Sequence, residues 1–424
     1  MGFFTTAMTS AITSVVRMWL VRSFRPFRFT HDFDRSLNYQ TVESMGLYVH
    51  IPFCQRLCEF CPYCKQSYHR EQADIYVESL LREIELVCAG QKRKTVPSLY
   101  FGGGSPALLI EHFDRIISTL QKYFNVTEGI GVELHPDDVT VETLRKLKEV
   151  GVSRISVGIQ SFDEAILHKM GRVPLDVRQL FSALQEVSFD TVAMDFIFAL
   201  EGQTFASVKS DIDTAFANGA NHIALYPFID FAFAKHGVRK MRHSAMKKLL
   251  YDIAAYCESQ GYLRDSIWTF GKPGVDKYSS MTRDNFWGFG CSAATLLFDQ
   301  FKVNTFSPDA YADRINADTL PTALTIRFTR RQRMIYWLFW RLYTTRLVSS
   351  DFERVFGVPL QKMYGLELWL GCLFGLLKKE GDDYRLTVKG VFYFHHFEGY
   401  YTLAYIDRMW GIMRVTPFPK EMTL

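Results

Sequence analysis

The stretch LYVHIPFCQRLCEFCPYCK, residues 47–65, decides the fold, because in it a short apolar run leads into four closely spaced cysteines. Cys54, Cys58, Cys61 and Cys64 fall within eleven residues. A thiolate is a soft ligand, and several thiolates on one loop are typical of an iron–sulfur cluster or a zinc site. The spacing CxxxCxxC supplies three ligands and leaves the fourth iron of a cubane open. It therefore predicts a cluster with a reactive position.

A structural zinc site and a disulfide framework are the alternatives. Zinc sites usually take ligand pairs from two separated places, and no second CxxC or HxxxH pair follows the loop. Disulfides are disfavoured because 424 residues carry only 8 cysteines and no convincing secretion signal. The remaining cysteines, which we expect to pack as small apolar side chains, are Cys88, Cys257, Cys291 and Cys372.

The composition indicates a globular chain with one large domain and a smaller one. Hydrophobic residues make up 48% and aromatic residues 15%, which excludes general disorder. The net charge of +4 is mild and gives no reason to expect nucleic acid as a partner. Clustered reduced thiols predict a cytoplasmic location.

Residues 1–45 form an N-terminal extension before the first predicted strand. Arg17 and Arg22 interrupt its apolar part, so a membrane-spanning helix is not expected. Arginines mixed with large apolar side chains are compatible with peripheral membrane contact through residues 1–28. We favour a terminal helix packed on the main domain.

Apolar strand-like runs alternate with amphipathic helical patterns between residues 46 and 230. This alternation predicts an α/β fold, a partial (β/α)6 barrel over residues 46–300, with its ligands at the C-terminal ends of the strands. The six predicted strands are residues 46–51, 98–104, 131–135, 154–160, 192–200 and 222–228. The cysteine loop follows the first of them and so falls on the active face.

Residues 301–424 form the second predicted domain. Helical patterns at 330–346 and 366–381, followed by a hairpin-like segment at 382–390, resemble a winged-helix module. Its helices are more aromatic than basic, which favours a lid or substrate-packing role over DNA binding. We read the pair His395–His396 as part of a strand, where neighbouring side chains point to opposite faces and would not share a metal.

Polar residues and glycines stand at the ends of the later strands. The segment YFGGGSP, residues 100–106, removes side chains so that the backbone can approach a ligand. The strand-end polar residues, which could hold a ribose, an adenine or a carboxylate, are Glu133, Gln160, Arg172 and Asp195.

These segments together resemble the radical SAM superfamily, in its HemN-like branch typified by oxygen-independent coproporphyrinogen III oxidase. The resemblance is carried by YVHIPFCxxxCxxC, by FGGGSP, and by GVSRISVGIQSFDEAILHKMGR at 151–172. MDFIFALEGQT and FWGFGCSAA support it. It covers residues 46–300, and the C-terminal part looks like the appended domain of that family.

The resemblance implies a [4Fe–4S] cluster on Cys54, Cys58 and Cys61. S-adenosylmethionine (SAM) would bind the open iron, and its reductive cleavage would give a 5′-deoxyadenosyl radical that acts on the substrate. A second SAM is an option in this family. By the same resemblance, SAM and the cluster would be contacted by Tyr48, Gly103, Gly104, Ser105, Glu133, Gln160, Arg172 and Asp195, with Cys64 and Gln160 as candidate catalytic residues.

Departures from the family pattern keep the reaction open. The oxidase has the pattern CxxxCxxCxC, in which the fourth cysteine comes two residues after the third, whereas Cys64 comes three residues after Cys61. In two other motifs of the family, Glu201 stands in place of a proline and Pro174 in place of a histidine. Cys64 could be a spare thiol, another cluster ligand, or a hydrogen-atom donor or substrate-bonding group. The resemblance implies a bulky apolar or tetrapyrrole-like substrate, an electron donor such as flavodoxin or ferredoxin, and decarboxylation, or methylation or cyclopropanation with a second SAM. The alternative is a HemW-like haem chaperone.

Overall fold

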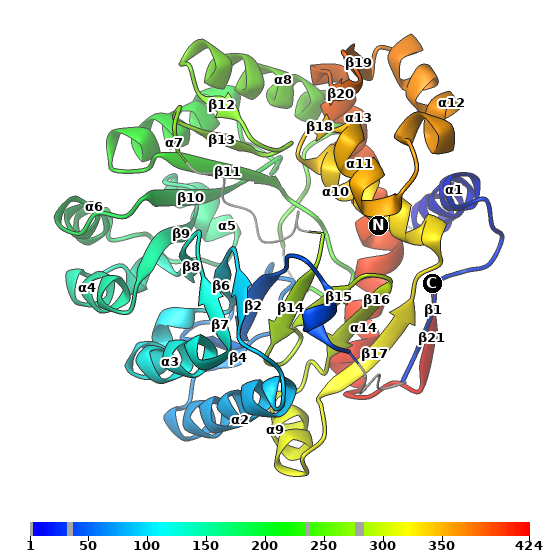
Figure 1. Ribbon diagram of the computed structural model, residues 1–424. Coiled ribbons are helices and arrows are strands. Elements are labelled where there is room, and N and C mark those ends of the chain that lie inside the picture. The colour runs from blue at the N-terminus through cyan, green and yellow to red at the C-terminus, as the bar shows by residue number, and fades with distance from the viewer. Residues whose placement is uncertain (1–2, 32–36, 235–236, 276–283) are drawn as a thin grey trace.

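One curved sheet organises the chain, whose computed structural model describes residues 3–31, 37–234, 237–275 and 284–424 (Figure 1). Within these residues the sheet has 14 strands. In spatial order they are β12 (Leu263–Arg264), β13 (Thr269–Gly271), β11 (His222–Pro227), β10 (Thr191–Phe198), β9 (Val152–Gln160), β8 (Ile130–Leu134), β6 (Leu99–Gly103), β2 (Gly46–Ile51), β14 (Phe286–Phe289), β15 (Ala294–Leu297), β16 (Gln300–Asn304), β17 (Thr322–Arg327), β1 (Arg28–Thr30) and β21 (Glu421–Thr423).

The parallel part of the sheet runs from β2 to β11. β2, β6, β8, β9, β10 and β11 pair in that order, each parallel to the next. They are the six predicted strands, with ends within two residues of the prediction. Their side chains are buried along most of their length, as expected for parallel strands covered on both faces. The predicted α/β fold is confirmed.

Helices cover the outside of this parallel part (Figure 1). Thr140 and Asp176 mark two helix starts, because their side chains accept hydrogen bonds from backbone amides of the first turn. The covering helices are α2 (Arg70–Cys88), α3 (Phe113–Tyr123), α4 (Val141–Glu149), α5 (Glu164–Lys169), α6 (Val177–Glu186), α7 (Phe205–Ala217) and α8 (His243–Ser259).

The sheet continues in both directions beyond the barrel strands. β14 pairs parallel to β2, and β15, β16 and β17 follow antiparallel, so the sheet runs through the predicted domain boundary at residue 300. β1 of the N-terminal extension lies between β17 and β21. Helix α1 (Phe3–Val21) packs against α10 and α13, and no helix in the described part of the chain is long and apolar enough to span a bilayer.

The C-terminal region is mainly helical, with a small sheet in the order β18–β20–β19. The predicted hairpin at 382–390 contains only one strand, β20 (Asp383–Leu386). Its partner β19 (Leu377–Glu380) lies in the segment predicted as helix, 366–381, and that prediction is wrong there because helix α12 ends at Leu373. The elements are α9 (Pro308–Asn316), α10 (Arg330–Tyr343), β18 (Arg346–Leu347), α11 (Ser349–Phe356), α12 (Leu360–Leu373), β19 (Leu377–Glu380), β20 (Asp383–Leu386), α13 (Val388–Tyr401) and α14 (Asp407–Val415).

The strand expected at His395–His396 is wrong, because both residues lie in helix α13. His395 is buried edge-on against Trp268, with ring centroids 4.2 Å apart, and burial lowers its pKa to about 3. A strand pattern was read into FYFHHF because apolar residues surround the pair. Helical packing against α8 explains those residues instead.

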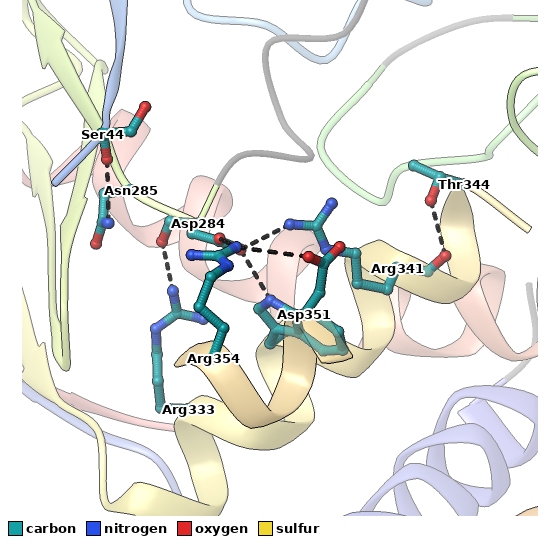
Figure 2. Close-up of polar contacts among 9 residues, drawn as sticks. Ser44, Asp284, Asn285, Arg333, Arg341, Thr344, Asp351 and Arg354 are labelled. Atoms are coloured by element: carbon teal, nitrogen blue, oxygen red, sulfur yellow. Dashed lines mark hydrogen bonds and ion pairs between the residues drawn. The ribbon is translucent and has the colours of Figure 1, made fainter. Parts of the chain in front are cut away.

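Asp284 joins the C-terminal helices to the sheet (Figure 2). Its carboxylate accepts hydrogen bonds from Arg341 and from the Trp337 indole, both at 2.8 Å, and from Arg354 at 3.3 Å. Arg333 donates to its backbone carbonyl. The next residue, Asn285, donates to the Ser44 carbonyl at 3.2 Å, so one short segment connects the C-terminal helices to the start of β2.

Candidate active site

The cysteine loop leaves β2 and is closed by a short parallel pair, β3 (Phe53–Cys54) and β4 (Gln66–Ser67). Inside the loop the Lys65 ammonium donates to the carbonyls of Cys58 and Cys61, at 3.0 Å for Cys61. Arg414 of α14 donates to the carbonyls of Pro62 and Tyr63, the latter at 3.0 Å. The loop is therefore braced from within and by the C-terminal helices.

Cys54, Cys58 and Cys61 are free thiols and only partly buried. Burial raises the pKa of Cys54 to about 12, with Cys61 and Cys58 adding to the rise and Lys65 opposing it. Three such thiolates together need positive charge, which iron supplies. The donor set fits a [4Fe–4S] cluster.

The glycine triplet brings β6 close to the cysteine loop. A Cβ on Gly104 would lie 2.3 Å from the Phe53 carbonyl oxygen and 3.0 Å from Cys54 Sγ. Gly103 has φ +115°, a conformation that favours glycine. The amides of Gly104 and Ser105 donate to Ile51 and Phe53 at 2.7 and 2.6 Å. These glycines are needed for close packing, and their contact with SAM stays a prediction.

Glu133, at the end of β8, is one of two partly buried carboxyl groups near the loop. It accepts hydrogen bonds from the Tyr100 hydroxyl at 2.8 Å and the Gly103 amide at 3.1 Å. Burial raises its pKa to about 7. The Tyr48 ring stacks on Tyr100, and the Tyr48 hydroxyl lies 3.0 Å from His50 Nδ1. The predicted residues Tyr48, Gly103 and Glu133 therefore come together.

Asp195 of β10 is the second partly buried carboxyl group. The Ser156 hydroxyl donates to it at 2.9 Å. Burial raises the pKa of Asp195 to about 7, and the charge of Glu133 adds to the rise. The two carboxyl groups are therefore close enough to interact electrostatically. Gln160 ends β9 with φ +70°, and Arg172 donates to the Gly158 carbonyl at 2.6 Å near the same strand end.

Four further residues of the site were missed from the sequence. The Tyr100 hydroxyl donates a hydrogen bond to Glu133, and the Asp138 carboxylate accepts one from the Ser105 hydroxyl. Tyr226 keeps 42% of its side chain accessible, yet burial and the charges of Tyr343 and Asp195 raise its pKa. Tyr100 lies in the quoted YFGGGSP segment and could have been found there. No motif near Tyr226 or Tyr343 in the sequence indicates that these two residues lie near the site.

Cys64 lies beside His50, which is itself a neighbour of the predicted residues Tyr48 and Gly103. Only 6% of Cys64 is exposed, and its thiol donates to the Phe306 carbonyl at 3.0 Å. Its sulfur lies within 4.8 Å of a ring nitrogen of His50 and of Cys291 Sγ. The expectation that Cys291 packs only as an apolar side chain is therefore incomplete, and a catalytic role for Cys64 stays a prediction.

Comparisons with known proteins agree with this site. The family model of the radical SAM superfamily matches residues 48–215. The heme chaperone HemW of Lactococcus lactis is 30% identical over 367 residues, 81% of this chain and 93% of that protein. The oxygen-independent coproporphyrinogen III oxidase of Synechocystis is 24% identical over 403 residues, 85% of each chain. The solved coproporphyrinogen III oxidase (HemN) of Escherichia coli matches with a TM-score of 0.74 and 21% identity, covering 90% of this chain and 98% of that one.

A parallel barrel with a three-cysteine loop after its first strand defines a protein that uses a cluster to activate a bound cofactor. The chain belongs to the radical SAM superfamily, in its HemN-like branch. It is a radical SAM enzyme, and its superfamily uses a [4Fe–4S] cluster with S-adenosylmethionine.

Proposed function

We propose that Cys54, Cys58 and Cys61 bind the cluster and that the chain acts on a bulky, tetrapyrrole-like small molecule. The observation that carries this proposal is a pair of partly buried carboxyl groups, Glu133 near the end of β8 and Asp195 within β10, on neighbouring parts of the sheet. The cluster and SAM, when bound, supply hydrogen-atom abstraction from an unactivated carbon.

The residues of the chain bind and orient the reactants. Carboxylates at Glu133 and Asp195 suit the hydroxyl groups of a ribose, and Arg172 suits a carboxylate. The tyrosine rings of Tyr226 and Tyr343 offer flat apolar surface, which suits a conjugated macrocycle. Arg414 holds the cysteine loop against α14, so the C-terminal helices limit access of water to the reacting atoms.

Two outcomes for a tetrapyrrole are supported by the relatives. The coproporphyrinogen III oxidases of Synechocystis and Escherichia coli favour oxidation of a porphyrinogen. Methylation or cyclopropanation with a second SAM is a variant that the resemblance leaves open. The HemW chaperone of Lactococcus lactis, matched over 93% of its length, favours haem binding and delivery. The two candidate functions have equal support.

Anaerobic turnover separates them. The reconstituted protein receives dithionite, SAM and either coproporphyrinogen III or haem, and 5′-deoxyadenosine, S-adenosylhomocysteine and porphyrin products are measured by mass spectrometry. An oxidase gives 5′-deoxyadenosine coupled to loss of carboxyl groups, and a methyl transfer also gives S-adenosylhomocysteine. A chaperone binds one haem per chain without coupled turnover. A full cluster with neither SAM cleavage nor haem binding would overturn the proposal.

A further inference from the structure

His50, Cys64 and Cys291 form a second group of metal-binding side chains behind the cysteine loop. One ring nitrogen of His50 and the two sulfur atoms all lie within 4.8 Å of one another, and all three residues are buried. No other such group of three occurs in the part of the chain that the structure describes. Zn–S bonds of about 2.3 Å and Zn–N bonds of about 2.0 Å place tetrahedral ligand atoms roughly 3.5–3.8 Å apart, so small side-chain movements would close the group on one ion.

The sheet brings these three residues together from distant parts of the sequence. β2 and β14 are parallel neighbours with Val49 opposite Phe289, so His50 and the Gly290–Cys291 turn leave the sheet side by side. A Cβ on Gly290 would lie 2.7 Å from the His50 carbonyl oxygen, which shows how closely the two strand ends approach. Cys64 reaches the same place from the end of the cysteine loop.

The turn that carries Cys291 is fixed by buried polar contacts. The Glu83 carboxylate accepts from the Gly290 amide at 2.7 Å and from the Tyr311 hydroxyl at 2.7 Å. The Tyr76 hydroxyl accepts from the Cys291 amide at 3.0 Å and donates to the His50 carbonyl at 2.7 Å. Pre-positioned ligands of this kind are what a metal site needs.

Simple apolar packing does not account for the two thiols. The Cys64 thiol has four polar neighbours in Cys291, His50, Ser292 and the Phe306 carbonyl, although it carries one proton. The hydrogen bond from Cys291 is the largest cause that lowers the pKa of Cys64, whereas burial raises the pKa of Cys291. The two sulfur atoms therefore lie close together in a buried polar setting, where two thiolates could hold a cation.

We propose that His50, Cys64 and Cys291 bind one thiophilic divalent cation of the Zn²⁺ class, separate from the cluster. Two thiolates cancel the charge of the ion, so the site is neutral when buried, and binding releases the protons of the thiols. His50 Nε2 now donates to the Cys64 carbonyl at 3.0 Å and Nδ1 accepts from Tyr48; ligation through one nitrogen replaces one of these bonds and leaves the other to orient the ring. The Tyr76 hydroxyl and the Phe306 carbonyl lie next to the group, and either oxygen could serve as the fourth ligand of the ion.

Such an ion would fix the C-terminal end of the cysteine loop to β2 and β14. Cys64 is three residues from Cys61, and His50 touches the glycine triplet, because a Cβ on Gly103 would lie 2.6 Å from its ring. The ion is thus a structural element that positions the loop. The proposal does not depend on the substrate.

Metal analysis of full-length variants tests this site. Zn²⁺ that occupies the cluster position is excluded by the variant Cys54→Ala/Cys58→Ala/Cys61→Ala, purified and dialysed against a weak chelator. We expect about one zinc per chain in this triple variant, and less than about one fifth of that when Cys291→Ala is added. Cys257→Ala, which removes another fully buried thiol, serves as the matched control and keeps its zinc.

Cobalt provides a readout that does not require the variants to be equally stable. Co²⁺ added to the metal-stripped triple variant should give thiolate charge-transfer and tetrahedral ligand-field bands, which Zn²⁺ then displaces. Three results would overturn the proposal: no zinc and no such bands in the triple variant, equal zinc with and without Cys291→Ala, or a Cys64–Cys291 disulfide in the anaerobically purified protein.

Discussion

The cysteine loop contributes to two groups of thiols, and the two groups differ in how easily the sequence reveals them. Cys54, Cys58 and Cys61 are close in sequence and partly exposed, so spacing alone identifies them and a cofactor can reach them. Cys64 and Cys291 are buried and 227 positions apart, and only the pairing of β2 with β14 brings them together with His50. The exposed group suits a reactive cluster, whereas the buried group suits a structural ion.

Loss of one cluster ligand should have the largest effect. Cys58→Ala leaves two of the three proposed cluster ligands, too few to hold the cubane, so iron falls from about four per chain to background and SAM cleavage is lost. Iron and 5′-deoxyadenosine are measured on the same anaerobic sample. Retention of four irons would show that another residue serves as the third ligand, and Cys257→Ala controls for loss of a thiol in general.

Adding a methyl group at Gly104 should weaken SAM binding at the part of the loop that carries Cys54. Its Cβ would collide with the Phe53 carbonyl at 2.3 Å, so β3 and Cys54 must shift. Overpacking of this kind costs about 1–3 kcal/mol, and we expect Gly104→Ala to raise the Kd for SAM about tenfold. Gly151→Ala, at a glycine with open space around it, separates backbone strain from collision. Unchanged SAM affinity would contradict the close approach.

The carboxyl groups of Glu133 and Asp195 should make the stability of the ligand-free protein depend on pH. Burial raises the pKa of Glu133 from 4.5 and of Asp195 from 3.8 to about 7, so their contribution to stability is full below pH 4 and is lost as the pH rises through 7. Glu133→Gln with Asp195→Asn should flatten the decline between pH 5 and 8 by about 1–3 kcal/mol. Chemical denaturation at several pH values measures the free energy of unfolding. If its dependence on pH is the same in the double variant and the wild type, both carboxylates are solvated in the folded protein and the prediction is wrong.

Cys64→Ala should have the smallest effect on the cluster. The Cys64 thiol contacts Phe306, His50 and Cys291 rather than the other loop thiols, so iron content should stay at the wild-type value. Iron per chain and the absorbance of the cluster report it directly. A variant that is folded by circular dichroism but lacks iron would make Cys64 a cluster ligand and would remove the distinction between the two groups.

The barrel could be predicted because each of its strands is a short apolar run followed by an amphipathic helix. The strands β15, β16 and β17 were not predicted, since antiparallel strands with mixed burial leave no comparable pattern. Cys54, Cys58 and Cys61 were predicted as cluster ligands from their spacing, and Glu133 was predicted as a site residue from its position at a strand end. His50 stood in the quoted motif without an assigned role, and Cys291 was read as packing because its partners are far away in sequence.

The electron paramagnetic resonance spectrum of the reduced cluster, recorded with and without SAM, tests directly whether three cysteines hold the cluster. We expect the wild-type spectrum to change when SAM is added, because three cysteines leave one iron open, and we expect Cys58→Ala to give no cluster signal. A wild-type spectrum that stays the same with saturating SAM would mean that all four irons are already ligated. That result would contradict the assignment of Cys54, Cys58 and Cys61 as the only protein ligands.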